Sequence, residues 1–174
     1  MTNQSSAMEG LQVRLLLSSV AMMLFTGLVF AIPDIMGNKD LFPGTKHMQL
    51  LHKEATGNSL MLAAMSFTLT FLELGPFARV AFEVSANAGA WMNVIPWIYA
   101  GATNAVLFFF EGQATGNVGA VPPPDNALHA GRIEAMLIVC TVGDVVAYVI
   151  LLLALLCRVC CGSACSGDEK KKRR

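Results

Sequence analysis

The sequence has little charge, and the charge it has is balanced. Charged residues make up 14% of its 174 residues, whereas a soluble domain usually carries about a quarter. Twelve Lys and Arg residues balance twelve Asp and Glu residues. This balance lacks the basic excess that nucleic-acid binding needs, so we expect no nucleic-acid partner. The hydrophobic content of 55% also excludes an intrinsically disordered chain.

The hydrophobic residues gather in four blocks, at residues 15–32, 59–74, 84–110 and 133–157, whose only charged members are Glu73, Glu134 and Asp144. A hydrocarbon core of about 30 Å is crossed by about 20 mostly apolar helical residues. A soluble four-helix bundle would show a charged outer face, which these blocks lack. The sequence therefore predicts an all-α, polytopic membrane protein, a bundle of four transmembrane helices in the lipid bilayer.

The predicted organisation has three parts. An N-terminal tail (1–14) precedes a transmembrane domain (15–157), and a Cys-rich basic tail (158–174) follows it. The four helices are expected at about 15–32, 57–75, 80–111 and 132–157. Four crossings put both termini on one side together with Arg79, and this side holds most of the basic residues. Because cytoplasmic loops carry an excess of Lys and Arg, we expect both termini in the cytosol.

The tail after the fourth block contains four clustered cysteines: Cys157, Cys160, Cys161 and Cys165. A disulfide framework is not expected in the reducing cytosol, and the paired CxxC spacing of a structural zinc site is absent. S-acylation and free thiols both remain open. Lys171 and Lys172 resemble a dilysine retrieval signal, which points to the endoplasmic reticulum of a eukaryotic cell.

Several polar side chains fall at membrane depth. Asn93, Trp97 and Asn104 are spaced by four and seven residues, so they share one helical stripe. For this stripe, hydrogen bonding between helices and a binding pocket remain equally open. Asp144 lies near the middle of the fourth helix, where a charge costs about 2.5–3.5 kcal/mol. We therefore expect Asp144 to be protonated, paired or beside water, and we favour a functional or partner-binding role.

Histidine is scarce, since the chain has only His47, His52 and His129. All three fall on the non-cytosolic side of the predicted topology. Three histidines can hold zinc, but the spacing of five between His47 and His52 does not align them on a helix. A histidine at a helix entry is more commonly an interfacial hydrogen-bonding residue than a metal ligand.

His52 is followed six residues later by Asn58, and Trp91-Met92-Asn93-Val94 comes further along the chain. This pattern resembles the styrene oxide isomerase family of small four-helix membrane proteins. The resemblance implies that His52 ligates the iron of haem b and that Trp91, Asn93 and Trp97 border the cofactor. It also implies a homotrimer with haem near the subunit contacts. Phe42-Pro43-Gly44 in the first loop fits the same pattern.

The sequence departs from the family at two positions. The family has an acidic residue two positions before the tryptophan and a tyrosine six positions after it, where this chain has Gly89 and Trp97. Tyr99 lies about 200° round the helix from Trp97 and does not replace the tyrosine. We hypothesise that Asp144 and Tyr148 supply an acid and a phenol to the site from the fourth helix.

The resemblance implies a specific activity. Ferric haem would act as a Lewis acid on an epoxide oxygen and isomerise a small lipophilic epoxide to a carbonyl compound, without a reductase. Asn58 would donate a hydrogen bond to the oxygen as its negative charge grows, with Asp144 and Tyr148 as further catalytic candidates. Trp91 and Trp97 would offer apolar walls to the substrate.

Two other functions fit the same sequence. In a haem protein for electron transfer or sensing, Met61, Met65 or His47 would supply a second axial ligand, although methionines at helical spacing are normally core residues. A cofactor-free tetraspan scaffold or assembly subunit would account for the basic tail and for Asp144 without any chemistry.

Overall fold

The structure is a computed structural model that describes residues 2–35, 45–105, 107–109, 113–115 and 123–172, with side chains described for 6–28, 50–105 and 123–160. Its described part contains the helices α1 (Thr2–Ile35), α2 (Thr45–Thr68), α3 (Pro76–Thr103) and α4 (Asn126–Lys172) and the short 3-10 helix η1 (Leu69–Phe71). The strands β1 (Leu107–Phe109) and β2 (Gln113–Thr115) form a small antiparallel hairpin. The predicted all-α fold class is confirmed.

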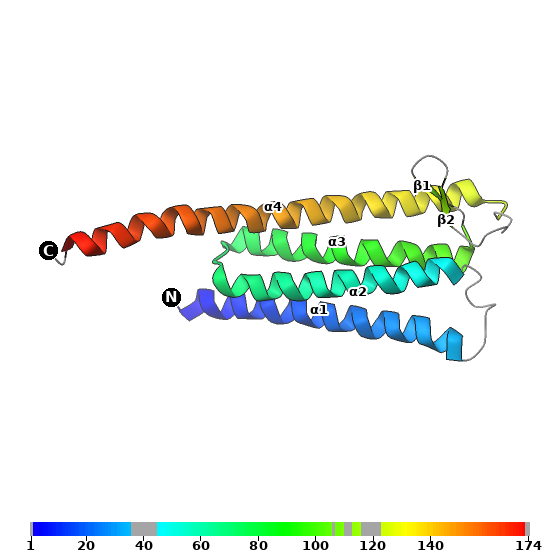
Figure 1. Ribbon diagram of the computed structural model, residues 1–174, viewed down its shortest axis with the longest axis horizontal. Helices are drawn as coiled ribbons and strands as arrows, with labels where there is room; N and C mark the ends of the chain where they lie inside the picture. Colours follow the sequence, from blue (N-terminus) through cyan, green and yellow to red (C-terminus); the bar gives the residue numbers. More distant parts are fainter. Residues whose placement is uncertain (1, 36–44, 106, 110–112, 116–122, 173–174) are drawn as a thin grey trace.

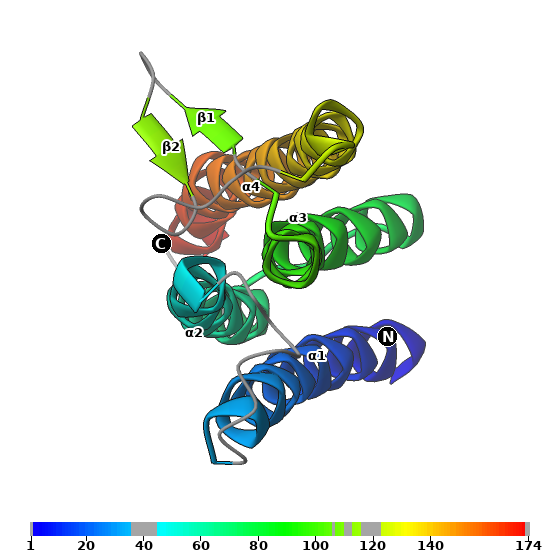
Figure 2. The same cartoon turned by 90° about the vertical axis from the view of Figure 1, so that its right-hand side faces the viewer.

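The four helices run alternately up and down, so that the beginning of α1 and the end of α4 lie at the same end of the bundle (Figure 1). The turn between α2 and α3 lies at this end too, and the β1–β2 hairpin lies at the other (Figure 1). α4 packs mainly on α3, α3 packs on α2, and α2 packs on α1. The end-on view shows α1 and α4 on opposite flanks of the α2–α3 pair (Figure 2).

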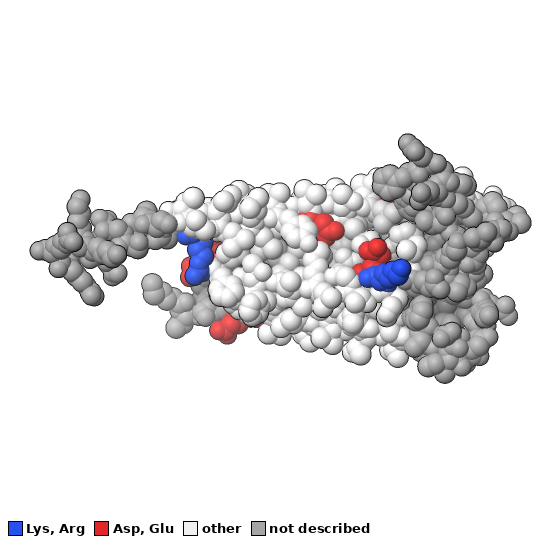
Figure 3. All heavy atoms as spheres, viewed as in Figure 1, with Lys and Arg blue, Asp and Glu red and all other residues white. Residues whose placement is uncertain are grey.

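Among the residues that the structure describes, two helical stretches are long and apolar enough to cross a membrane: Ser6–Leu28 in α1 and Asn126–Cys160 in α4. Many of their apolar side chains face outward, including Leu17, which is 62% exposed, and Ile138, which is 64% exposed. Charged atoms are sparse over the middle of the face in Figure 3. Large exposed apolar surfaces mark membrane or protein contacts, so the structure supports association with a membrane.

All four helices differ in their bounds from the prediction. α1 begins at Thr2 rather than near residue 15, and α4 continues to Lys172, so most of the predicted tail at 158–174 extends a helix. α2 begins at Thr45 and ends at Thr68, instead of covering 57–75. Hydropathy marks the apolar part of a helix, whereas the helix itself continues through polar residues until a breaker stops it. His52 therefore lies two turns inside α2 and not at its first turn.

The predicted third helix, 80–111, is wrong at both ends. α3 begins at Pro76, because proline suits the first position of a helix, where its missing N–H is not needed. It ends at Thr103, and Asn104 follows in the left-handed conformation with φ 51°. Asparagine tolerates this conformation and often ends helices in this way. Residues 107–109 then belong to β1 and not to a helix.

The core follows the inner faces of the helices. Fully buried side chains include Leu15 of α1, Leu62 of α2, Phe82 of α3 and Ile133 of α4. α3 contributes several small buried residues, Ala86, Gly89, Ala90, Ala100 and Gly101. Small residues allow two helix backbones to approach closely. α4 packs closely against α3 at Gly89.

Candidate functional site

A polar contact joins α1 to α3 through the predicted cofactor-binding residue Trp91. The indole Nε1 of Trp91 donates a 2.9 Å hydrogen bond to Ser18 Oγ. Ser18 in turn donates to Asn87 Oδ1 over 2.6 Å, and the ring of Phe25 lies 6.1 Å from that of Trp91. Trp91 is half-buried and serves the α1–α3 contact, so its polar end faces away from α4.

A second polar cluster joins α2, α3 and α4, and we call Glu54, Asn93, Cys140 and Asp144 the inner polar cluster. Asn93 Nδ2 donates a 2.9 Å hydrogen bond to Glu54 Oε2, and Glu54 also interacts electrostatically with Cys140. The Cys140 thiol donates to Asp144 Oδ2 over 3.7 Å. The cluster therefore brings together Asn93 and Asp144, two of the predicted site residues, from different helices.

Glu54 is a member of this cluster that the sequence reading missed. The second helix was expected to begin near residue 57, so Glu54 was expected to lie in the preceding loop. α2 begins at Thr45, and Glu54 is consequently a helical residue that faces α3. The signal that could have revealed it is its spacing of four from Asn58, which places both on one side of a helix.

Asp144 lies directly against the backbone of α3. A Cβ atom placed on Gly89 would overlap the carboxylate of Asp144. The carboxylate of Asp144 from α4 therefore occupies the space that a side chain at position 89 would fill. Among the described residues, Asp144 Oδ1 is buried against α3 at Gly89 and has no hydrogen-bond partner.

Asn58 is the most nearly enclosed of the predicted catalytic residues. It is 7% exposed, and its Nδ2 is buried without a hydrogen-bond partner in the described part of the chain. An unsatisfied buried amide costs about 1–3 kcal/mol. Buried polar groups in proteins normally have a protein or water partner, so the Nδ2 of Asn58 is a donor whose partner the described residues do not supply.

His52 lies on the outer surface of α2 with its imidazole exposed. Its backbone carbonyl accepts a 2.8 Å hydrogen bond from Thr56 Oγ1. The step of six residues from His52 to Asn58 turns the helix by about 600°, which is about 120° short of two whole turns. The exposed imidazole faces outward and the buried amide faces inward. A haem held by His52 would lie against the outside of α2, where a neighbouring subunit or lipid would cover its far side.

The remaining predicted residues lie apart from each other. Trp97 is a core residue of α3 and is 8% exposed. Tyr148 is 51% exposed on α4, one turn beyond Asp144, and its ring lies on the outside of the helix. Met65, considered as a second haem ligand, is packed in the core.

The histidines do not form a shared metal site in the part of the chain whose side chains are described. His129 Nδ1 lies 2.6 Å from the hydroxyl of Tyr99, and His47 falls outside the described side chains. Among those described, no group of three or more His, Cys, Asp and Glu residues is arranged to hold a metal ion. Haem needs only one histidine on one side of the iron, so the chemistry of an exposed His52 still fits that group.

A third polar group, missed by the sequence reading, closes the hairpin end of the bundle. The Tyr99 hydroxyl contacts His129 Nδ1 and accepts a 3.0 Å hydrogen bond from Arg132 NH1. Tyr99 belongs to α3, and the other two residues belong to α4. The sequence separation of 30 residues between Tyr99 and His129 gave no signal for this contact.

Comparison with known proteins adds no further constraint on this site. No protein-family model, curated protein or solved structure matches the chain. The function is therefore inferred from the residues and contacts described above.

Proposed function

We propose that the chain is a multi-pass membrane protein that crosses the bilayer four times, with both termini in the cytosol. Three features support this arrangement: the up-and-down order of the helices (Figure 1), the exposed apolar side chains of α1 and α4, and the excess of basic residues at the end that holds both termini. The positive-inside rule gives the orientation.

We further propose that the protein binds haem b and isomerises a lipophilic epoxide to a carbonyl compound. The observation that carries this proposal is the pair formed by an exposed imidazole, His52, and a buried amide with an unused donor, Asn58, on one helix. A single accessible imidazole is the ligand that haem iron needs on one face. An orphaned amide is the donor that a substrate oxygen needs.

Each residue has a distinct part in the proposed reaction. His52 would hold the iron through one ring nitrogen, and ferric haem, when bound, supplies a Lewis acid for the epoxide oxygen. Asn58 Nδ2 would donate a hydrogen bond to that oxygen only if both side chains face one space in the haem-bound protein, because in the structure the imidazole faces outward from α2 and the amide faces inward. Asp144, whose Oδ1 has no hydrogen-bond partner among the described residues, would stabilise the positive charge that develops on carbon when the C–O bond opens. A hydride shift within the substrate completes the reaction without net electron transfer.

The exposure of His52 also bears on assembly. A haem on the outside of α2 would be exposed unless another surface covered it, and apolar porphyrin is stabilised by burial. We propose that a second copy of the chain provides this cover. A homo-oligomer, a trimer by the family resemblance, would place the cofactor between neighbouring subunits.

The test is spectroscopic and then catalytic. The full chain, purified in detergent and supplied with haem, should develop a Soret band, and the His52→Ala variant should not. An aryl epoxide incubated with the loaded protein without reductant should give the aldehyde, detected by gas chromatography. A wild-type protein that stays colourless would overturn the proposal.

A cofactor-free scaffold or assembly subunit is the second candidate. The observation that favours it is the use of polar groups in contacts between helices, as in Trp91–Ser18 and Asn93–Glu54, because hydrogen bonds between helices contribute to the packing of membrane helices without any catalytic role. A haem protein for electron transfer would instead show the low-spin spectrum of a six-coordinate iron, which the same titration detects.

A further inference from the structure

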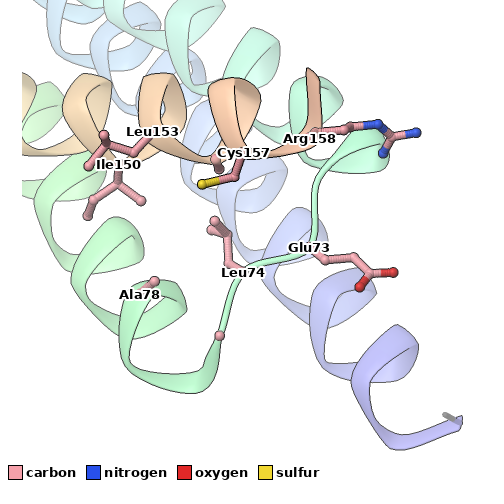
Figure 4. A pocket seen from close by; sticks show the side chains of 9 residues that line it. Glu73, Leu74, Ala78, Ile150, Leu153, Cys157 and Arg158 are labelled. Carbon is pink, nitrogen blue, oxygen red and sulfur yellow. The ribbon is translucent and has the colours of Figure 1, made fainter. Parts of the chain in front are cut away.

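A cavity of 490 Å³ lies at the end of the bundle opposite the hairpin, between α4 and the segment that enters α3. Figure 4 shows the side chains of Leu74, Ala78, Ile150 and Cys157 directed toward it. Its lining residues are Glu73, Leu74, Gly75, Ala78, Ile150, Leu153, Ala154, Cys157 and Arg158. None of the predicted haem or substrate residues belongs to this set, so the cavity is separate from the proposed active site.

The walls and the rim of this cavity differ in chemistry. The interior is made mainly by aliphatic side chains from α4 and from the start of α3, which suits a hydrocarbon chain. The charged groups of Glu73 and Arg158 lie at its edge and extend away from the apolar walls (Figure 4). The cavity therefore fits a molecule with an apolar chain and a charged head.

The two charges at the rim do not neutralise each other. Arg158 donates a hydrogen bond to the backbone oxygen of Phe71. Glu73 forms no hydrogen bond or ion pair with any residue that the structure describes. The salt bridge among those residues joins Arg14 to Glu83 instead. One cation and one unpaired anion at the mouth of an apolar cavity complement a head that itself carries both signs of charge.

The start of α3 adds a site for the anionic part of such a head. Gly75, the N-cap of α3, lines the cavity and provides no side-chain cap. The first N–H groups of a helix and its dipole favour a phosphate. Arg158, which lines the same cavity, supplies the positive charge on this side of the bundle.

The position of the cavity fits a lipid. Ile150 to Arg158 are at the end of the apolar stretch Asn126–Cys160 of α4, where the hydrocarbon core gives way to headgroups if α4 crosses the bilayer. We infer that this cavity binds one phospholipid with a zwitterionic phosphoethanolamine head, with an acyl chain along the aliphatic walls, its phosphate at the start of α3 and Arg158, and its ammonium on Glu73. The inference rests on the proposed membrane location but not on haem binding.

Native mass spectrometry of the full chain in detergent tests the inference, with dioleoyl phosphatidylethanolamine, dioleoyl phosphatidylglycerol and dioleoylglycerol as probes. The wild type should bind one phosphatidylethanolamine at least tenfold more tightly than either other probe. Ala154→Phe fills the cavity and should reduce this binding at least tenfold. Leu155→Phe adds a similar side chain on α4 outside the lining set and should leave binding unchanged.

Glu73→Gln keeps the shape of the rim and removes the ammonium partner. This variant should lose most of the preference for phosphatidylethanolamine over phosphatidylglycerol. If Ala154→Phe fails to fold, Glu73→Gln still tests the inference. Equal binding of the three probes by the wild type would overturn the inference, as would undiminished binding in a folded Ala154→Phe variant. An acyl chain that remains on Cys157 under denaturing conditions would also overturn the inference, because the cavity would then hold a chain bound covalently as a thioester and not a phospholipid. The Soret band, measured on the same samples, reports the proposed function separately.

Discussion

The carboxylate of Asp144 on α4 occupies the space in which a side chain at position 89 of α3 would lie, and Gly89 leaves that space open. The contact is reciprocal, because a Cβ on Gly143 would lie 2.7 Å from the backbone nitrogen of Gly89 and 2.8 Å from the carbonyl oxygen of Ser85. Two glycines thus bring α3 and α4 close enough for an acidic group to reach across.

Gly143→Ala should separate α3 from α4. The new methyl group meets backbone atoms of Ser85 and Gly89, which cannot rotate away, and such overpacking typically costs about 1–3 kcal/mol. We expect the free energy of unfolding, measured by denaturant titration in mixed micelles, to fall by about this amount. Gly131→Ala on the same helix is the control, because no atom lies within 4 Å of its added Cβ, and it should be neutral or slightly stabilising.

His52→Ala should abolish the Soret band of the haem-supplied protein, since it removes the proposed iron ligand. Helical content, measured by circular dichroism, should stay unchanged, because the imidazole is exposed and outside the core. His129→Ala should retain the band. A band of equal height in His52→Ala would show that another residue binds the iron.

Asn58→Leu should separate a catalytic role from a structural one. Asn58 Nδ2 has no partner in the described part of the chain, so its loss removes no internal hydrogen bond, and the unfolding free energy should not fall. If Asn58 donates to the substrate oxygen, turnover of the aryl epoxide should drop by about 10²–10³-fold while the Soret band remains. Unchanged turnover would contradict the proposed role of this amide.

Asn93→Ala should destabilise the inner polar cluster. Glu54 Oε2 would lose the 2.9 Å hydrogen bond from Asn93, and an unsatisfied, partly buried acceptor costs about 1–3 kcal/mol. A double-mutant cycle with Glu54→Ala, which removes the acceptor, measures the coupling between the two side chains. Strict additivity of the two single changes would show that this hydrogen bond does not contribute to stability.

The chain has two tyrosines, and they provide a matched pair. Tyr99→Phe removes the hydroxyl that joins His129 and Arg132 and should cost about 1 kcal/mol. Hydrogen exchange should become faster at the end of α3 and the beginning of α4. Tyr148→Phe, whose ring is 51% exposed, should change neither the exchange nor the stability; similar effects of both changes would argue against a specific Tyr99 contact.

The sequence predicted the helical class well because composition and hydropathy act locally. Long runs without charge have few alternatives to a helix that exposes apolar side chains. The helix ends were harder to predict from the sequence. The end of α3 depends on the left-handed conformation of Asn104, and the first residues of α2 are polar, so hydropathy does not assign them to a helix. For that reason the sequence placed Glu54 in a loop.

The sequence alone determined that this chain carries long apolar runs and an acidic residue, Asp144, within the last of them. Only the tertiary structure decided which of these groups meet. Helix rotation and the close α3–α4 contact place Asp144 beside Gly89, Asn93 on Glu54 and Tyr99 on His129. These pairs are separated by 30 residues or more in the chain, so no local pattern encodes them; they arise because packing fixes the angle at which each helix presents its side chains.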